Sequence, residues 1–112
     1  MLARSQRLRN NRDILRVLKR GRFVRTPHLK IIILASRLPQ LRAAAVISKK
    51  VDKRAVVRNR NRRRVIEVIR INLPHLKAGF DILVYIQSDL TSVTPGDLEV
   101  EIMHSLSKLG VS

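Results

Sequence analysis

The chain has 112 residues, of which 24 are Lys or Arg and 8 are Asp or Glu, and its formal net charge is +16. It has no Cys, which excludes a disulfide scaffold, a thiolate metal site and a cysteine nucleophile, while the large positive charge indicates a polyanionic partner. The longest apolar runs, such as Ile31–Ala35, are too short to span a bilayer and no signal peptide is readable, so we expect a soluble cytoplasmic protein.

The first half of the chain predicts a tail, a helix and three strands. Residues 1–10 are polar and basic without apolar periodicity, which predicts a basic mobile tail before a single domain over residues 11–112. Helical periodicity begins at Asn11, and Gly21 is expected to end this helix. The predicted strands are Arg22–Arg25, Leu29–Ala35 and Arg42–Ser48.

The second half predicts a helix, a strand and a final helix. From Ala55 to Asn72 the pattern predicts a helix with one apolar face and one basic face, and Pro74 ends this helix. A strand follows at Phe80–Ile86, and the last helix begins after the N-cap Thr94 and ends at Gly110. The order α-β-β-β-α-β-α predicts an α/β (α+β) two-layer sandwich with a four-stranded sheet.

The strongest functional signal is a basic run between the third strand and the middle helix. Nine of the 16 residues from Lys49 to Arg64 are Lys or Arg, opposed only by Asp52. The alternative interpretation is a basic helix face exposed to solvent. Nucleic-acid contact is favoured because like charges at helical spacing destabilise a helix, whereas guanidinium groups bind phosphate well. The residues predicted to contact nucleic acid are Ser48, Lys49, Lys50, Lys53, Arg54, Arg58, Asn59, Arg60, Arg62, Arg63 and Arg64.

Charge is distributed unevenly along the chain. Residues 1–64 hold 21 basic and 2 acidic residues, whereas residues 65–112 hold 3 basic and 6 acidic residues. The first segment is therefore expected to face the nucleic acid. Within this segment, Lys49 and Lys50 either bind phosphate or are simply polar residues at the end of the third strand. On the first helix, Ile14 and Leu18 form either core or part of a groove bordered by basic side chains such as Arg12.

Nothing in the sequence indicates catalytic machinery. Its only acidic cluster, Asp97, Glu99 and Glu101, falls in the first turns of a helix, where acids complement the helix dipole. The three His are scattered. We therefore expect no catalytic residue and no protein-bound metal.

The segment Val46–Arg70 resembles the protein subunit of bacterial ribonuclease P. That family has a strand ending in Ser-Lys-Lys, a short loop, and a helix that opens with Arg-Asn-Arg and continues with basic residues. The resemblance extends over about residues 7–109, including Arg7-Leu8, Asp13, Gly21 and the strand Phe80–Val84. Its central matches are Ser48, Lys49, Lys50, Arg58, Asn59, Arg60, Arg62, Arg63, Arg64 and Glu67.

The resemblance implies a fold like the second domain of a small-subunit ribosomal protein, with a left-handed β-α-β crossover. It implies a subunit of a ribonucleoprotein endoribonuclease whose RNA performs the hydrolysis with bound magnesium. The protein would bind the ribonuclease P RNA through the Arg-Asn-Arg helix and the 5′ leader of precursor tRNA in a cleft between the first helix and the sheet. The leader-cleft positions would be Arg12, Ile14, Leu18 and Ile32.

Two departures from the family pattern are visible. Ile14, Leu18 and Ile32 are aliphatic where the family often has aromatic residues, so we expect leader contact to be weaker or more electrostatic. Asn61 replaces a usually apolar residue, and we expect it to be partly exposed or bonded to the backbone. Two other hypotheses remain: a structural ribosomal-RNA-binding protein, and a non-specific DNA-binding protein.

Overall fold

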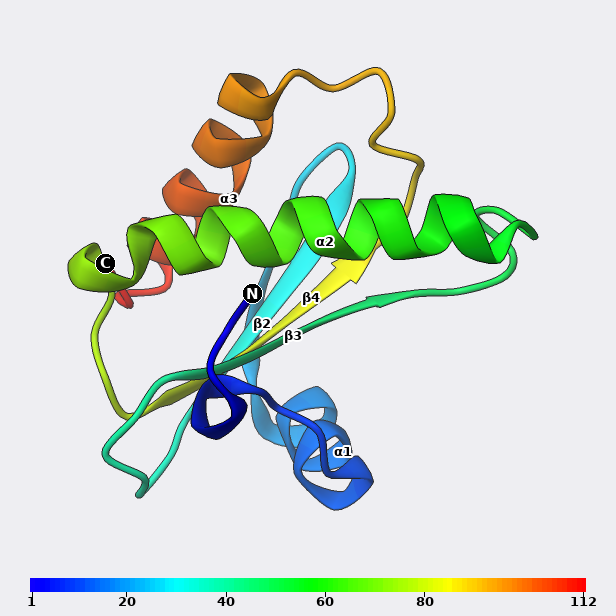
Figure 1. Cartoon of the computed structure of the whole chain (residues 1–112). Helices are drawn as coiled ribbons and strands as arrows, with labels where there is room; N and C mark the ends of the chain where they lie inside the picture. Colours follow the sequence, from blue (N-terminus) through cyan, green and yellow to red (C-terminus); the bar gives the residue numbers. More distant parts are fainter.

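Four strands pair into one mixed sheet in the order β1-β2-β4-β3, as shown by the computed structural model, which describes residues 1–112 (Figure 1). Strand β4 pairs antiparallel with β2 and parallel with β3, and β1 is added antiparallel at the outer edge of β2. Both long inner strands consist mainly of Ile, Leu and Val, which is typical of strands covered on both faces. The strands are β1 (Arg22–Arg25), β2 (Leu29–Ala35), β3 (Arg42–Ile47) and β4 (Phe80–Ile86).

Three helices flank the sheet: α1 (Asn11–Arg20), α2 (Ala55–Asn72) and α3 (Pro95–Lys108). The α+β class, the four-stranded sheet and the element order are confirmed, and Thr94 is the N-cap of α3, where its hydroxyl accepts a hydrogen bond from the N–H of Asp97. The sequence did not predict the two 3-10 turns, η1 (Arg4–Gln6) and η2 (Leu73–His75). None of the helices combines the length and apolar character needed to cross a membrane.

The helices cover both faces of the sheet, with α2 and α3 on one face and α1 on the other (Figure 1). The α2 and α3 side holds the larger core, and the α1 side holds a smaller cluster that includes Val17, Ile32 and Leu83. The larger core combines Ile31, Ile33, Ile82 and Val84 from the sheet with Val65, Ile69, Ile102 and Leu106 from the helices.

Helix α2 connects the parallel neighbours β3 and β4. When the sheet is viewed from the α2 side with these strands pointing upward, β4 lies to the left of β3 (Figure 1). The crossover is therefore left-handed, in contrast to the right-handed form that such connections almost always take.

Residues 1–10 do not form the mobile tail that the sequence predicted. Leu2 and Leu8 are both 3% exposed, Leu2 in the larger core and Leu8 under α1. The N–H of Leu8 donates to the carbonyl of Ala43, which extends the sheet by one isolated bridge between Arg7 and Ala43. Two leucines spaced six residues apart are too sparse to show as periodicity, but they are sufficient to hold the segment in place.

A buried ion pair joins the sheet to α1. Asp81 on β4 is 0% exposed, and its register partner Arg42 on β3 donates to both carboxylate oxygens at 2.9 and 2.8 Å. The same guanidinium donates to Asp13 of α1 at 3.1 Å. The two carboxylates, with Asp81 contributing most, raise the pKa of Arg42.

Gly21 ends α1 for a steric reason rather than through a left-handed conformation, since its φ is −72°. A Cβ at this position would lie 2.5 Å from the Ile32 Cγ2 atom and 2.5 Å from the Val17 carbonyl oxygen. The absent side chain allows the backbone after α1 to lie directly against β2.

We predict that Gly21→Ala lowers the free energy of unfolding by about 1–3 kcal/mol, because backbone must move to admit the methyl group. Gly96→Ala is the matched control, since a Cβ there meets no atom within 4 Å. The control should be neutral or stabilising by up to about 1 kcal/mol in the same denaturant titration. Equal stability of Gly21→Ala and the native chain would contradict the steric explanation.

Candidate nucleic-acid interface

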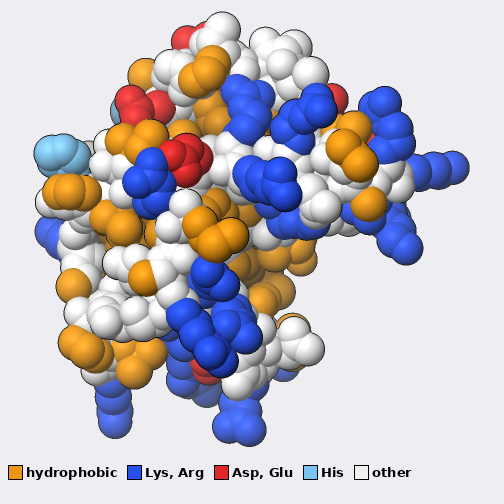
Figure 2. Space-filling view, in the orientation of Figure 1, with side chains coloured by type: hydrophobic (Ala, Val, Ile, Leu, Met, Phe, Trp, Pro, Cys, Tyr) orange, Lys and Arg blue, Asp and Glu red, His pale blue; other side chains and the backbone are white.

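The loop between β3 and α2 presents a group of side chains to solvent. Ser48, Lys49, Lys50 and Lys53 are all exposed, and the Ser48 hydroxyl accepts a hydrogen bond from the N–H of Lys50 at 3.2 Å. None of the three lysines has an acidic partner. Figure 2 shows Lys and Arg side chains gathered over this end of α2. The loop after β3 therefore carries three ammonium groups that are free to bind an anion.

Asp52 organises the start of α2. Its carboxylate accepts two hydrogen bonds from the Arg54 guanidinium, at 3.1 and 2.9 Å, and one from the Arg54 N–H at 2.8 Å. These bonds lower the pKa of Asp52 to about 2 and raise the pKa of Arg54. Arg58 folds back on the same loop and donates to the carbonyls of Asp52 and Lys53, at 3.1 and 2.8 Å. Arg54 and Arg58 thus stiffen the loop that carries the free lysines.

Further along α2, the predicted arginines divide into two groups. Arg60 and Arg63 are exposed, with no hydrogen bond or ion pair to the rest of the chain. In contrast, Arg62 donates to the side chain of Asn59, and Arg64 donates to two backbone carbonyls of the loop between β4 and α3. Arg64 therefore has a structural role, whereas Arg60 and Arg63 are available to a ligand.

Asn61 was expected to be either partly exposed or bonded to the backbone. It is 2% exposed and is bonded to the backbone. Its amide nitrogen donates to the Val57 carbonyl at 3.1 Å and to the Asp89 carboxylate at 3.0 Å, and its oxygen accepts from the Leu90 N–H at 2.9 Å. The bond from Asn61, with those from Thr91, lowers the pKa of Asp89. Asn61 fastens the loop after β4 to α2.

Helix α1 covers only part of the sheet face on which it packs. The predicted cleft residue Ile32 is 2% exposed beneath α1 and belongs to the core on this face of the sheet. Ile14 and Leu18 of α1 are half-buried in the same cluster, and Arg12 is exposed on α1. The aliphatic cleft predicted from the sequence is therefore mainly core.

Beyond α1, the same face continues as an open sheet surface formed by Phe23, Lys30, Val46, Ser48 and Tyr85. Tyr85 is half-buried between its register partners Lys30 and Val46, and the Lys30 Nζ lies 4.5 Å from the centroid of the Phe23 ring. The sequence predicts Tyr85 only as part of the strand Phe80–Ile86. The signal that could have found this surface is Lys30, a charged residue in an otherwise apolar strand, because strand alternation places it on one face with its cross-strand neighbours.

A pocket of about 370 Å³ connects the open sheet surface to the basic loop. Ser48, Lys50 and Val51 line it from the loop, and Tyr85 lines it from β4. An aromatic ring beside a hydroxyl and an ammonium group is suited to a nucleotide, whose base stacks and whose phosphate takes the charge.

Two of the three acidic residues of α3 are engaged in contacts within the chain. Glu101 accepts hydrogen bonds from the Thr26 hydroxyl at 2.5 Å and the His28 N–H at 3.3 Å, and it pairs with the His28 ring at 3.0 Å. Glu99 accepts from the Asn72 amide at 3.0 Å. The fold brings together no group of three His, Cys, Asp or Glu side chains that could hold a metal ion.

An α+β fold that carries an exposed cationic helix and loop beside an aromatic sheet face is typical of the class of basic nucleic-acid-binding proteins. The sequence model of the family described as Ribonuclease P matches residues 2–110. The chain therefore belongs to the ribonuclease P protein family.

Individual relatives agree with this assignment. A ribonuclease P protein component of Chloroflexus aurantiacus is 39% identical over 87 residues, which cover 78% of this chain and 64% of that protein, so the match spans less than two thirds of that relative. One from Microcystis aeruginosa is 35% identical over 96% of this chain and 88% of that protein.

Solved structures match in fold. A Staphylococcus aureus RNase P protein mutant with defective mRNA degradation activity has a TM-score of 0.86 at 23% identity, covering 96% of this chain and 91% of that one. The RNase P protein from Thermotoga maritima has a TM-score of 0.79 at 25% identity, covering 88% of this chain and 92% of that one.

We predict that the Asp52 carboxyl titrates with a pKa of about 2 and that Arg54→Ala moves this pKa upward. The backbone bond from residue 54 remains, so the pKa should stay below the ordinary value of about 3.9. Because the folded pKa is lowered, the stabilisation is complete above the unfolded-state pKa and is lost as the pH falls through the folded value. Carboxyl NMR titration measures the change, and Arg63→Ala, which removes an unpaired arginine, should leave the Asp52 pKa where it is.

Proposed function

We propose that this chain is the protein subunit of a ribonuclease P ribonucleoprotein, which removes the 5′ leader of precursor tRNA and leaves a 5′-phosphate on the tRNA. In this proposal the catalytic RNA performs the hydrolysis. The protein binds that RNA with the loop and the exposed face of α2, and it binds the leader on the open sheet surface. The supporting observation is the continuity of these two surfaces through the pocket shared by Ser48, Lys50 and Tyr85.

Electrostatics explains why such a subunit would help. The catalytic RNA and precursor tRNA are both polyanions, so their approach is opposed by phosphate repulsion and counterion condensation. A small body with a net charge of +16 placed between them replaces condensed counterions and lowers that repulsion. Lys49, Lys50, Lys53, Arg60 and Arg63 carry this role, since the fold leaves them without internal partners.

The leader would gain specific contacts from two aromatic rings. Tyr85 lies at the inner part of the open sheet surface and Phe23, 53% exposed, lies at its edge. Each ring can stack on an unpaired base, a contact worth roughly 1–3 kcal/mol. The aromatic rings that the family often has on α1 and β2 would thus be replaced by rings on β1 and β4, and Lys30 between them would bind phosphate.

Magnesium would serve the reaction from the RNA side by stabilising charge on the attacking and leaving oxygens. The acidic side chains of α3 are poorly suited to share such an ion, because Glu99 and Glu101 are already bound to Asn72, Thr26 and His28. The contribution of this chain would be indirect, through the phosphate geometry that its cations stabilise.

The direct test is cleavage of a precursor tRNA by a bacterial ribonuclease P RNA at low magnesium, with and without this protein. We expect the protein to restore cleavage that the RNA alone performs only at high magnesium. Absence of stimulation at every magnesium concentration would overturn the proposal. Cosedimentation with ribosomal subunits instead would favour a ribosomal-RNA-binding protein, and preference for duplex DNA at matched salt would favour a DNA-binding protein.

Arg60→Ala should weaken binding to the catalytic RNA and lower the slope of log affinity against log salt concentration by about one unit, the effect of losing one phosphate contact. Arg70→Ala is a matched control on the same helix, because Arg70 is already paired with Glu67. Binding titrations over a range of salt concentrations measure both slopes. Identical slopes for Arg60→Ala and the native chain would show that Arg60 is merely solvated.

A further inference from the structure

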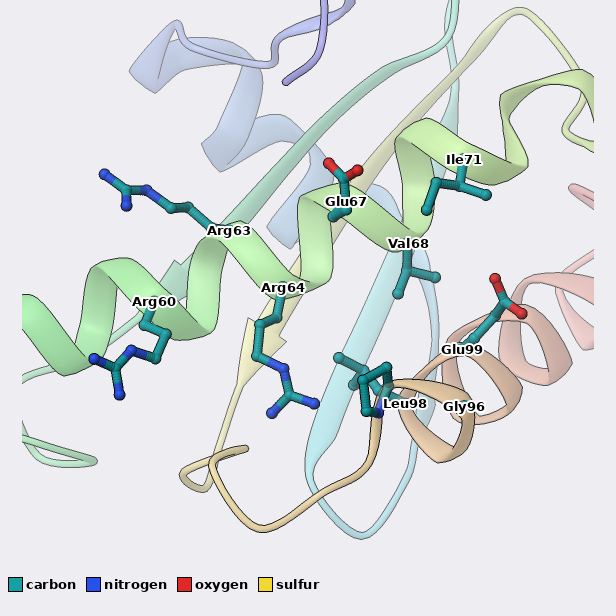
Figure 3. A pocket seen from close by; sticks show the side chains of 10 residues that line it. Arg60, Arg63, Arg64, Glu67, Val68, Ile71, Gly96, Leu98 and Glu99 are labelled. Carbon is teal, nitrogen blue, oxygen red and sulfur yellow. The ribbon is translucent and has the colours of Figure 1, made fainter.

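Between α2 and the start of α3 lies a groove of about 540 Å³ that the proposed contacts with the leader do not use (Figure 3). Its floor is apolar, since Val68 and Leu98 are 8% and 1% exposed. One wall is Ile71, which is 55% exposed although Val68, one turn before it, is core. The opposite wall is the exposed Pro95-Gly96 backbone of α3.

Polar groups lie at the two ends of the groove. Arg60 and Arg64 extend from the same side of α2, whereas Arg63 and Glu67 extend from the other side (Figure 3). Arg64 is held by the backbone carbonyls of the neighbouring loop, which leaves Arg60 as the free cation at this end. At the other end Glu99 extends from α3 toward α2, and only its Oε2 atom is engaged, by Asn72.

We propose that this groove binds one unpaired nucleotide of the partner RNA, with an adenine or cytosine base. The base would lie over Val68 and Leu98 against Ile71, its phosphate would pair with Arg60, and its exocyclic amino group would donate to the Glu99 Oε1 atom. This inference rests on the proposed function, because it assigns a further contact to the RNA that α2 binds.

The chemistry of the groove supports a nucleotide over other occupants. Uracil has no exocyclic amino group, and guanine presents two adjacent donors that call for both carboxylate oxygens, of which Asn72 already occupies one. A protein partner needs a larger apolar surface than this groove supplies, since Ile71 is its one exposed large hydrophobic residue. The N-terminus of α3 adds little attraction of its own, because Pro95 has no N–H and Thr94 already caps Asp97.

Gly96 provides a way to fill the groove without disturbing the fold. It lines the groove, and a Cβ added to it meets no atom within 4 Å. Gly96→Leu should therefore fold normally and occupy the place of the base. Ile71→Ala removes the opposite wall and serves as the second variant. Val100→Leu is the matched control, because Val100 is exposed on the same helix outside the groove.

The experiment is dimethyl sulfate probing of a bacterial ribonuclease P RNA saturated with each protein, together with affinity measured over a range of salt. We expect an unpaired adenine or cytosine to be protected by the native chain and by Val100→Leu but not by Gly96→Leu or Ile71→Ala. Affinity should fall roughly tenfold for Gly96→Leu, because the base loses its apolar contacts and its hydrogen bond to Glu99, with the salt slope retained because Arg60 is intact.

The remaining outcomes overturn the inference in distinguishable ways. If all four proteins bind the RNA and give the same protection pattern, the groove is empty in the complex while the proposed function stands. If Gly96→Leu instead alters self-association in sedimentation, the occupant is a second copy of the chain. If the native chain does not bind the RNA at all, the proposed function fails, and the groove proposal fails with it.

Discussion

The placement of α1 depends on the ion pair between Arg42 and Asp81. Asp81 is fully buried on the inner strand β4, so its charge must be matched, and the bidentate bonds from Arg42 match it within the sheet. The remaining donor of Arg42 reaches Asp13, which fixes α1 over the first half of β4. The second half of that sheet face therefore remains uncovered, and the aromatic surface around Tyr85 exists because α1 is held at the other end.

A second constraint acts on α2, which must pack on the sheet while carrying six arginines. Its buried stripe is narrow, and Asn61 lies within it. Asn61 donates to Asp89 and accepts from the Leu90 N–H, and Arg64 donates to the same loop. These hydrogen bonds hold the loop between β4 and α3 against α2. The groove between α2 and α3 follows from these links, because the loop that they fix determines where α3 begins.

The helices and strands could be predicted from the sequence because local signals determine them. Apolar periodicity and the caps at Thr94 and Gly21 set the helix bounds, and β-branched runs set the strands. Tyr85 and Ile32 show what local signals omit: the first faces an open surface and the second is covered, and only the register of β2 with β4 and the position of α1 decide this. The same holds for Leu2 and Leu8, whose burial requires the completed sheet.

The division of charge along the sequence does not become a division in space. Strand β4, from the acidic segment, lies between β2 and β3 of the basic segment, and α3 packs on α2. An acidic residue of the second segment therefore reaches into the basic region, where Asp81 pairs with Arg42. Asp52, within the basic segment itself, pairs with Arg54. A cation is free to bind an external anion when the fold gives it neither an acidic partner nor a carbonyl acceptor. Near α2 that condition selects Lys49, Lys50, Lys53, Arg60 and Arg63.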